Sequence, residues 1–313
     1  MAEEKTVFPE GMPLVSVIVP TFNRAHCLER ALSSVQAQDY ANWEFIVADD
    51  GSTDGTYELA ERLAQAEPRV RLLPRVECNQ GSAAARNRAM AAARGKYLAL
   101  LDSDDEWLPG KLTRQVAVME AADESVGICF TGAKILKNGG PRFALDIPKK
   151  EWEKDPLAYF ATGRMPFTTS TTMLRRRCVE IVGLMDQSLR RGQDIDYFLR
   201  IFLADIGLLT IQDVFTVMNL ETRKSLLYEK AKFRQKTFMD KYYSVLRQRR
   251  GAWLARRFAG DLWQYVADRG LREHHYFGAL LALGKSAMYH PGNALCSIKQ
   301  DVKAFLCGIV PYL

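Results

Sequence analysis

The sequence predicts an α/β protein with a doubly wound, mostly parallel sheet and a helical C-terminal extension. Two observations favour the sheet. Apolar runs of strand length alternate with amphipathic helical patterns, and acidic clusters directly follow two of these runs. A third observation favours the extension, because long helical patterns rich in Lys, Arg and aromatic residues dominate from Leu226 onward. The 313 residues, 48% hydrophobic and 26% charged, are typical of a folded globular chain.

The predicted elements alternate through about residue 130. An apolar run at 14–19 is closed by Pro20 and precedes a segment with apolar residues at helical spacing. The next expected elements are a strand at 43–48, a helix at 56–66, a strand at 70–74, an Ala-rich helix from 82 with Gly95 in its C-terminal capping position, and a strand at 96–102. This alternation at short spacing predicts parallel pairing.

Beyond residue 130 the regular alternation of strands and helices ends. The expected elements are a strand at 126–136, a short helix at 155–161, a β-rich run from 168 leading into a helix, and an amphipathic helix at 194–204. The long basic helical patterns then begin. We therefore expect a domain boundary near residue 220.

The net charge of +6 hides an asymmetry between the two parts of the chain. Residues 223–313 carry 17 Lys and Arg against 6 Asp and Glu, whereas residues 1–222 carry 26 against 31. An acidic first part suits a metal-dependent site. The basic second part suits an anionic lipid, a nucleic acid or an acidic polymer.

The cysteines and termini predict an intracellular chain. The six cysteines show no CxxC pair and no zinc-ligand spacing, so buried thiols in a reducing compartment are expected. The polar, acidic N-terminus lacks the features of a secretory signal, which favours a cytoplasmic location. The apolar stretches at 277–284 and 304–313 are shorter than the ~20 residues that span a bilayer, so no transmembrane helix is predicted.

Two acidic clusters predict a ligand-binding edge. Asp49 and Asp50 follow one expected strand, and an Asp-x-Asp sequence, Asp102 and Asp104, follows another. The carboxyl ends of parallel strands line the ligand crevice, and paired carboxylates there hold a divalent cation against phosphate oxygens. This pattern points to a nucleotide-diphosphate substrate. A formal calcium-loop match from Asp50 to Glu61 is rejected, because a β-rich run and not a helix precedes it.

Five segments in order resemble the family 2 inverting glycosyltransferases, which have the GT-A fold: VSVIVPTFNR, FIVADDGSTDGT, NQGSAAARNRA, GKYLALLDSDDEW and RRGQDIDYFLR. The resemblance covers roughly residues 14–220 and implies transfer of a sugar from a nucleotide-diphosphate donor, with UDP-sugar favoured, to an acceptor hydroxyl with inversion. It implies a catalytic domain at 1–222, with donor binding at roughly 14–130 and acceptor binding at roughly 131–222. Residues 223–313 form the basic helical region.

The resemblance also implies which residues contact the donor. Pro20 and Thr21 line the uridine pocket, with Asn23 and Arg24 in the same turn, although an ordinary turn needs the same residue types. Either Asp49 or Asp50 binds the base or ribose; the competing interpretation is an Asx-turn and helix N-cap. The remaining implied donor contacts are Gly81, Arg86, Asp102 and Ser103. Arg88 lies two residues from Arg86, so at most one of the two points into the crevice.

The acid cluster is assigned to the metal. The resemblance and the preference of Mn²⁺ or Mg²⁺ for hard oxygen ligands assign Asp104 to the cation. Asp102 is assigned to the ribose or to a metal-bound water. Asp105 is either a supporting partner or an N-cap.

Asp194 is the expected catalytic base. It starts the amphipathic helix, where the helix dipole stabilises a carboxylate, although a structural N-cap is the competing role. The family usually has Glu-Asp at this point, whereas this chain has Gln193 and Asp194. Glutamine cannot accept a proton at neutral pH, so Asp194 takes the role, with Asp196 as the fallback.

Three features of the sequence are each consistent with two interpretations. The run Thr168–Thr172 supplies acceptor-binding hydroxyls or forms a β-rich wall, with the wall favoured. Trp107 and Trp152 stack on a sugar or lie in the core. The basic stretch 230–266 contacts an anionic membrane as a peripheral anchor or forms a solvated helical face, and no nucleic-acid motif accompanies it.

The expected acceptor is a carbohydrate, lipid-linked or part of a surface polysaccharide, and the oligomeric state stays open. One alternative function is a sugar-phosphate nucleotidyltransferase, which needs a Gly- and Lys/Arg-rich loop after the first strand. The other is a non-catalytic nucleotide-sugar-binding protein.

Overall fold

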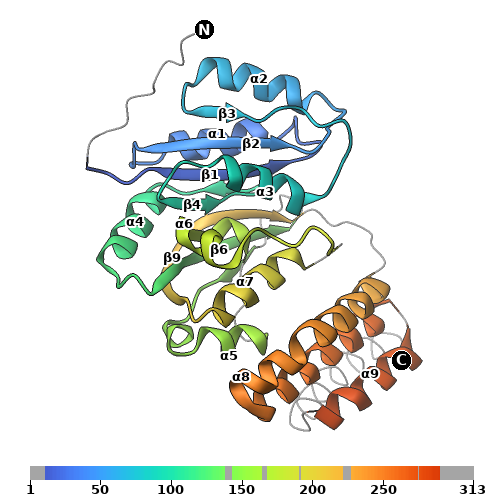
Figure 1. Ribbon diagram of the computed structural model, residues 1–313. Coiled ribbons are helices and arrows are strands. Elements are labelled where there is room, and N and C mark those ends of the chain that lie inside the picture. The colour runs from blue at the N-terminus through green and yellow to red at the C-terminus, as the bar shows by residue number, and fades with distance from the viewer. Residues whose placement is uncertain are drawn as a thin grey trace. The chain divides into compact units, whose positions relative to one another are not determined.

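The computed structural model describes residues 11–137, 143–163, 168–189, 192–220, 227–273 and 275–289. The N-terminal segment, the apolar stretch at 304–313, Cys296, Cys307 and the arginines of the RRGQD segment lie outside these residues. The described residues group into two compact units (Figure 1). The first contains the residues up to Leu157 and those from 168 to 220. The second contains 158–163 and the residues from 227 to 289.

The first unit is built on a mixed sheet with helices. Its strands are β1 (Val15–Thr21), β2 (Trp43–Asp49), β3 (Val70–Leu72), β4 (Tyr97–Leu100), β5 (Glu106–Trp107), β6 (Val126–Lys137), β7 (Phe143–Asp146), β8 (Thr172–Arg175) and β9 (Gly207–Leu220). The helices that start in it are α1 (Leu28–Gln36), α2 (Thr56–Ala66), α3 (Ser82–Ala92), α4 (Lys111–Ala121), η1 (Lys150–Lys154), α5 (Pro156–Ala161), η2 (Thr169–Thr171), α6 (Arg176–Val182) and α7 (Gln193–Leu203).

The strand order within the described residues is β3-β2-β1-β4-β8-β6-β9-β5, with β7 paired to β6. The predicted α/β class is confirmed, and β3, β2, β1 and β4 pair in parallel. The parallel block ends earlier than residue 130, because β8 comes from a later segment and pairs antiparallel with β4 and β6. A second parallel pair, β6 with β9, lies beyond β8.

The register of the parallel strands brings the predicted site residues to one edge. Thr21 at the end of β1 lies opposite Asp49 at the end of β2, and Ile18 lies opposite Leu100 of β4. The strands point the same way, so the residues that follow them emerge together. The carboxyl edge of this block therefore carries both acidic clusters.

The buried face of α1 is the one that its periodicity predicts, whereas the end of α3 differs from its prediction. On α1, the buried residues are Leu28, Ala31, Leu32 and Val35. The Ala-rich α3 ends at Ala92, so Gly95 is not its cap. A Cβ atom on Gly95 would lie 2.5 Å from the Leu14 carbonyl oxygen and 2.7 Å from the Ser16 amide nitrogen. Glycine stands there because β1 approaches the backbone too closely for a side chain.

A buried lysine lies in the core of the first unit. Lys111 on α4 is fully buried, its Nζ donates to Gln115 Oε1 at 2.5 Å, and the same Nζ lies 4.3 Å from the centre of the Trp107 ring. Removal from water disfavours the ammonium and lowers the pKa of Lys111 from 10.5 to about 7. The amine is thus much more easily deprotonated than a lysine on the surface.

We expect Lys111→Met to flatten the pH dependence of stability. Between about pH 7 and 10.5 the unfolded lysine holds a proton that the folded lysine releases. This group therefore makes the wild-type free energy of unfolding rise with pH across that window, and methionine removes the rise. Urea unfolding at both ends of the window measures it. Exposed Lys149→Met is the matched control, and an unchanged slope in Lys111→Met would contradict the expectation.

The second unit is helical, as predicted for the C-terminal region. Its main elements are α8 (Leu227–Arg272) and α9 (Tyr276–Tyr289), and α8 is broken at Gly251, where φ is 88°. Among the described residues, no helix combines the length and apolarity that a bilayer crossing requires. Of the described cysteines, Cys27, Cys129 and Cys178 are buried as expected, whereas Cys78 is exposed.

Candidate active site

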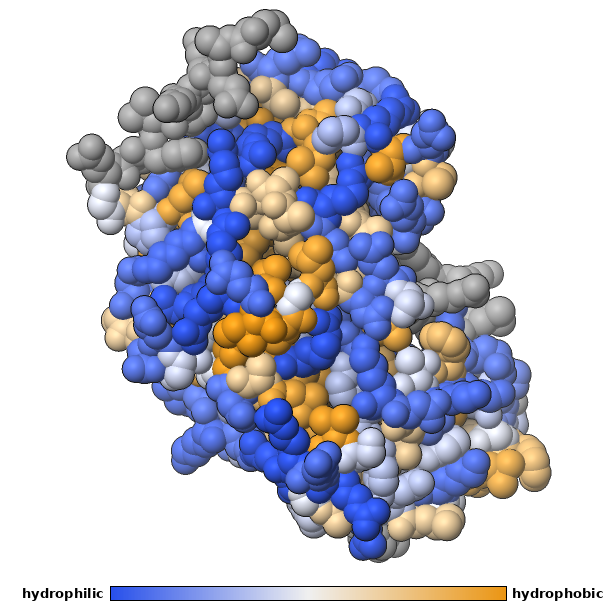
Figure 2. Space-filling view, in the orientation of Figure 1, coloured by the Kyte–Doolittle hydropathy of each residue, from blue (hydrophilic) through white to orange (hydrophobic). Residues whose placement is uncertain are grey.

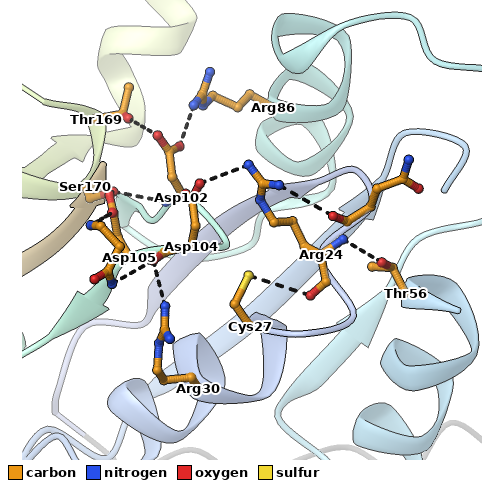
Figure 3. Close-up of polar contacts among 12 residues, drawn as sticks. Arg24, Cys27, Arg30, Thr56, Arg86, Asp102, Asp104, Asp105, Thr169 and Ser170 are labelled. Carbon is orange, nitrogen blue, oxygen red and sulfur yellow. Dashed lines mark hydrogen bonds and ion pairs between the residues drawn. The ribbon is translucent and has the colours of Figure 1, made fainter. Parts of the chain in front are cut away.

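Asp102 leads the acid cluster at the end of β4 (Figure 3). One carboxylate oxygen pairs with Arg86 of α3, and the other accepts a hydrogen bond from Thr169 Oγ1 at 2.8 Å. The Asp102 amide donates to Ser170 Oγ at 3.1 Å. Both ends of the residue are thus fixed, and its side chain stays 31% exposed. This arrangement leaves the carboxylate oriented and open to a ligand.

Asp104 is held by Arg24 of the first strand–helix connection and by Arg30 of α1. Its Oδ2 accepts from the Arg24 guanidinium at 3.0 Å, and its carbonyl oxygen accepts from Arg30 at 3.1 Å. The Asp104 side chain is 28% exposed. Arg24 and Arg86 come from separate elements and both point toward the cluster (Figure 3).

Asp105 supports the cluster from behind. It is buried, accepts from Ser170 Oγ at 2.5 Å, and accepts from the Asn219 amide of β9 at 3.2 Å. Burial, with the negative charge of Asp102 in addition, raises the pKa of Asp105 to about 7. The next helix is capped by Gly110, so Asp105 has the supporting role and not the N-cap role.

Arg86 is the buried cation of the site. Burial disfavours its charge, yet the nearby carboxylates of Asp102, Asp194 and Asp104 outweigh burial and raise the pKa of Arg86. Within the described residues its Nε has no hydrogen-bond partner. Arg88 points elsewhere and donates to the Asp49 carbonyl oxygen at 2.9 Å. The two arginines therefore lie on different faces, and Arg86 is the one at the acid cluster.

The first acidic pair shapes the loops. Asp49 is fully buried and accepts from the amides of Gly51 and Ser52 at 3.1 and 2.9 Å, which is the Asx-turn expected as its alternative role. Asp50 accepts from the amides of Gln80 and Gly81 at 3.0 and 2.8 Å, and burial raises the pKa of Asp50. Asp50 thus joins the Gly81 loop to the end of β2.

The turn after β1 is pinned to the second loop. Asn23 has a left-handed backbone with φ of 54°, its amide donates to Ser52 Oγ at 2.8 Å, and the Arg24 amide donates to Thr56 Oγ1 at 2.7 Å. Pro20 lies inside β1, and Thr21 ends it. Within the described residues, the buried Thr21 hydroxyl has no hydrogen-bond partner. Ser103 is also buried, inside the acid cluster.

Asp194 lies in the first turn of α7 and not at its cap. The N-cap is Gly192, and Asp194 Oδ1 accepts from the Ile195 amide at 2.9 Å. The charge of Asp194 acts on Arg86, which places it beside the acid cluster. The fallback base, Asp196, is fully buried and pairs with Arg200 at 2.9 Å. Of these two carboxylates, Asp194 is partly exposed and Asp196 is buried.

Three supporting residues had little signal in the sequence. Thr169 and Ser170 belong to the run that we expected to form a wall, yet they form η2 and hold Asp102 and Asp105. Asn87, next to Arg86, donates to the Met185 carbonyl oxygen at 2.8 Å and accepts from the Met185 amide at 2.9 Å. Asn87 thus ties α3 to the segment that leads into α7.

The two tryptophans lie in the interior. Trp107 and Trp152 are each 2% exposed, as the core interpretation predicts. Trp107 Nε1 donates to the Ser170 carbonyl oxygen at 2.8 Å. Trp107 therefore supports η2 and does not stack on a sugar.

The carboxylates of Asp102 and Asp104 fit a divalent cation. Both offer partly exposed hard oxygen atoms next to one another. Across the described ranges, no group of three or more His, Cys, Asp or Glu is arranged to hold a metal ion. Mg²⁺ commonly takes one or two carboxylates and completes its shell with substrate phosphates and water. The residues present suit a cation bound in that way.

The sequence and the fold of this chain are similar to those of known glycosyltransferases. Residues 16–180 match the model of glycosyl transferase family 2. A putative teichuronic acid biosynthesis glycosyltransferase, TuaG of Bacillus subtilis, is 39% identical over 128 residues, covering 41% of this chain and 50% of TuaG. The UDP-Glc:α-D-GlcNAc-diphosphoundecaprenol β-1,3-glucosyltransferase WfgD of Escherichia coli is 43% identical over 125 residues, covering 40% of this chain and 47% of WfgD.

A solved structure supports the fold over a longer range. The mannosyltransferase PcManGT of Pyrobaculum calidifontis, in complex with GDP-Man and Mn²⁺, matches with a TM-score of 0.60 and 22% identity. The match covers 94% of this chain and 81% of PcManGT. The chain spans about half the length of the two curated relatives. On the family match and the GT-A fold, this chain belongs to glycosyl transferase family 2.

Proposed function

We propose that this chain is an inverting, metal-dependent glycosyltransferase that moves a sugar from a nucleotide-diphosphate donor, preferably a UDP-sugar, to an acceptor hydroxyl. One observation carries the proposal. Asp102 and Asp104 lie at the carboxyl edge of the sheet, and buried Arg86 links them electrostatically to Asp194 on α7. A donor-binding edge and a candidate base thus meet at one cluster.

The donor occupies the edge from β2 to β4 in this proposal. Its nucleoside lies by Thr21, Asp50 and Gly81, and its ribose contacts Asp102. The Thr21 hydroxyl and the Arg86 Nε, which have no hydrogen-bond partner among the described residues, support these roles, because a buried polar atom without a partner is costly unless a ligand satisfies it. UDP is favoured because the relative WfgD is named for a UDP-Glc donor.

Asp104 would hold Mn²⁺ or Mg²⁺, with Asp102 beside it. When bound, the cation supplies positive charge that stabilises the departing nucleoside diphosphate. Arg24 and Arg86 keep the two carboxylates oriented for this purpose. Mn²⁺ is a reasonable choice, since PcManGT was solved with that ion.

Asp194 takes the proton of the acceptor hydroxyl. Its Oδ1 is engaged by the Ile195 amide, so Oδ2 is the atom assigned to the proton. Asn87 orients the segment before α7 through its two bonds to Met185. The hydroxyl then attacks the face of the sugar opposite the departing diphosphate, and this single displacement inverts the anomeric carbon.

The proposed acceptor is a carbohydrate carried on a lipid diphosphate or on a growing surface polysaccharide. WfgD is named for a diphosphoundecaprenol-linked acceptor, and TuaG for teichuronic acid synthesis. Residues 1–222 form the catalytic domain in this proposal, with 223–313 as a basic helical region. A peripheral contact with an anionic membrane belongs to the same proposal, because a lipid-linked acceptor stays in the bilayer.

The nucleotidyltransferase alternative lacks its phosphate-binding loop. The connection after β1, Phe22–Cys27, contains no glycine, and its Arg24 side chain is engaged by Asp104. The family match likewise favours sugar transfer over nucleotidyl transfer.

A thermal-shift panel of UDP-, GDP- and dTDP-sugars, with and without Mn²⁺, tests the donor class. We expect a UDP-sugar to raise Tm, and to raise it more with Mn²⁺, because a ligand that binds only the folded state stabilises it. Hits are then tested for transfer to lipid-linked and soluble acceptors. The absence of any nucleotide-sugar shift would contradict the proposal.

A further inference from the structure

Helix α9 buries small residues and leaves four large hydrophobic residues exposed, whereas its Leu283 packs against the core of the helical unit. Ala279, Ala282 and Ser286 are buried against the rest of the helical unit, and Ser286 Oγ donates to the Gly260 carbonyl oxygen of α8 at 2.9 Å. The outward residues, with their exposed fractions, are Phe277 (78%), Leu280 (64%), Leu281 (53%) and Met288 (83%). A surface helix normally shows the opposite arrangement, with its large apolar side chains facing the core.

Close packing fixes this orientation. A Cβ atom on Gly278 would lie 1.9 Å from Tyr228 Oη, and one on Gly270 would lie 3.0 Å from the Tyr228 ring. The two helices therefore approach through positions that admit only small residues. Rotation of α9 to bury Phe277 and Leu280 would bring larger side chains into that space. The outward apolar face is thus a consequence of the packing.

Positive charge flanks the apolar face. The described residues from 227 to 289 contain 13 Lys and Arg and 5 Asp and Glu. A groove of about 720 Å³ between α8 and α9 is lined by Lys232, Lys236 and Lys285, by the acids Glu229 and Asp240, and by Leu281. Lys232 pairs with Glu229 at 3.1 Å, so Lys236 and Lys285 supply the excess of positive charge there. Lys285 Nζ lies 4.3 Å from the centre of the Trp263 ring in the same groove. Cations and exposed apolar side chains therefore occur side by side.

We propose that the outward face of α9 is a docking surface for an anionic lipid bilayer. Phe277, Leu280, Leu281 and Met288 enter the interfacial region, and the lysines of the groove contact acidic headgroups. An amphipathic helix with basic flanks binds membranes in this way, through buried apolar area and attraction to anionic lipid. The proposed contact adds the apolar face of α9 to the basic stretch 230–266, which contributes Lys232 and Lys236.

A second copy of the chain is the competing occupant of this face. The excess of positive charge around α9 disfavours it, since two copies of the same basic surface repel each other, whereas an anionic bilayer attracts that surface. The biological purpose of this contact rests on the proposed function. The contact itself does not, because vesicle binding is measured without donor or acceptor.

Vesicle sedimentation of the full chain tests the surface. The vesicles contain phosphatidylcholine alone or phosphatidylcholine with phosphatidylglycerol. We expect binding to the anionic vesicles at low salt and weaker binding at high salt. The double variant Phe277→Ser with Leu280→Ser should bind at least about tenfold less, since two inserted side chains are lost. Both substituted residues are exposed, so circular dichroism should show an unchanged fold.

The matched control is Ile181→Ser with Leu184→Ser. Ile181 of α6 is 55% exposed, and Leu184, which follows this helix, is 39% exposed. Hydrophobic residues also gather near the middle of the face shown in Figure 2. This control should bind vesicles as the wild type does. An equal loss in both double variants, or no vesicle binding by the wild type, would overturn the proposal.

Light scattering tests whether α9 mediates self-association instead of membrane binding. If the wild type were a dimer that does not bind vesicles and the α9 variant were a monomer, α9 would be a self-association face and the proposal would be overturned. Donor-induced thermal shifts, measured on the same samples, report on the catalytic site independently. A failed donor panel with intact vesicle binding would count against the proposed function alone.

Discussion

Replacing Asp194 by asparagine should abolish sugar transfer while donor binding stays close to that of the wild type. Asparagine keeps the size of the side chain and the acceptor atom for the Ile195 amide, but it cannot take up the proton of an acceptor hydroxyl. Loss of a general base costs about 10²–10⁴-fold in rate. We therefore expect kcat to fall by that factor, with little change in the Kd for UDP-sugar.

Single-turnover transfer and donor titration, measured on the same sample, separate these quantities. Glu61→Gln is the matched control, because Glu61 is an exposed acid on α2 and its replacement also removes a charge. The control should transfer sugar as the wild type does. A non-catalytic sensor would show no response to Asp194→Asn in any functional output, and retained transfer in that variant would move the base to another residue.

The second large effect is expected for Asp104→Asn. The substitution removes the carboxylate assigned to the cation and leaves Arg24 without its ionic partner. Loss of electrostatic stabilisation at a reacting group costs about 10²–10³-fold in rate. We expect transfer to fall by at least that factor, and the enhancement of UDP binding by Mn²⁺ to disappear.

Calorimetric titration of UDP with and without Mn²⁺ measures the loss. Asp39→Asn is the control, since Asp39 is an exposed acid that accepts from Thr113 Oγ1 at 2.7 Å. It should keep the response to Mn²⁺. A full Mn²⁺ response in Asp104→Asn would place the cation elsewhere. Chelation of the wild type with EDTA should lower donor affinity in the same direction.

Local patterns predicted the parallel half of the sheet well. The strands β1, β2 and β4 are largely apolar, and the polar residues after them emerge at the carboxyl edge once the strands pair in parallel. The placement of Asp102 and Asp104 at that edge follows from this order. The mixed half was less predictable, because β8 pairs with β4 across a separation of some 75 residues.

The residues that hold the acid cluster in place could not be predicted from the sequence. Thr169 and Ser170 have the composition of a strand, yet they bond to Asp102 and Asp105, which lie 65 or more residues earlier in the chain. Asn87 and Met185 are 98 residues apart. Such contacts depend on which segments pack together, and a hydrogen-bonding side chain carries no local sign of its distant partner.

The sequence by itself determined the fold class, the acidic edge and the helical nature of the C-terminal region, because hydrophobic periodicity and strand-end chemistry are local properties. Only the tertiary structure decided that Gly95 admits a close strand, that Asp196 is buried in an ion pair with Arg200, and that α9 faces outward with Phe277 and Leu280. Hydrophobic periodicity does not show which side of an apolar helix is buried when one side carries small residues and the other carries large ones. In α9 the side with small residues is buried, because it packs against Tyr228.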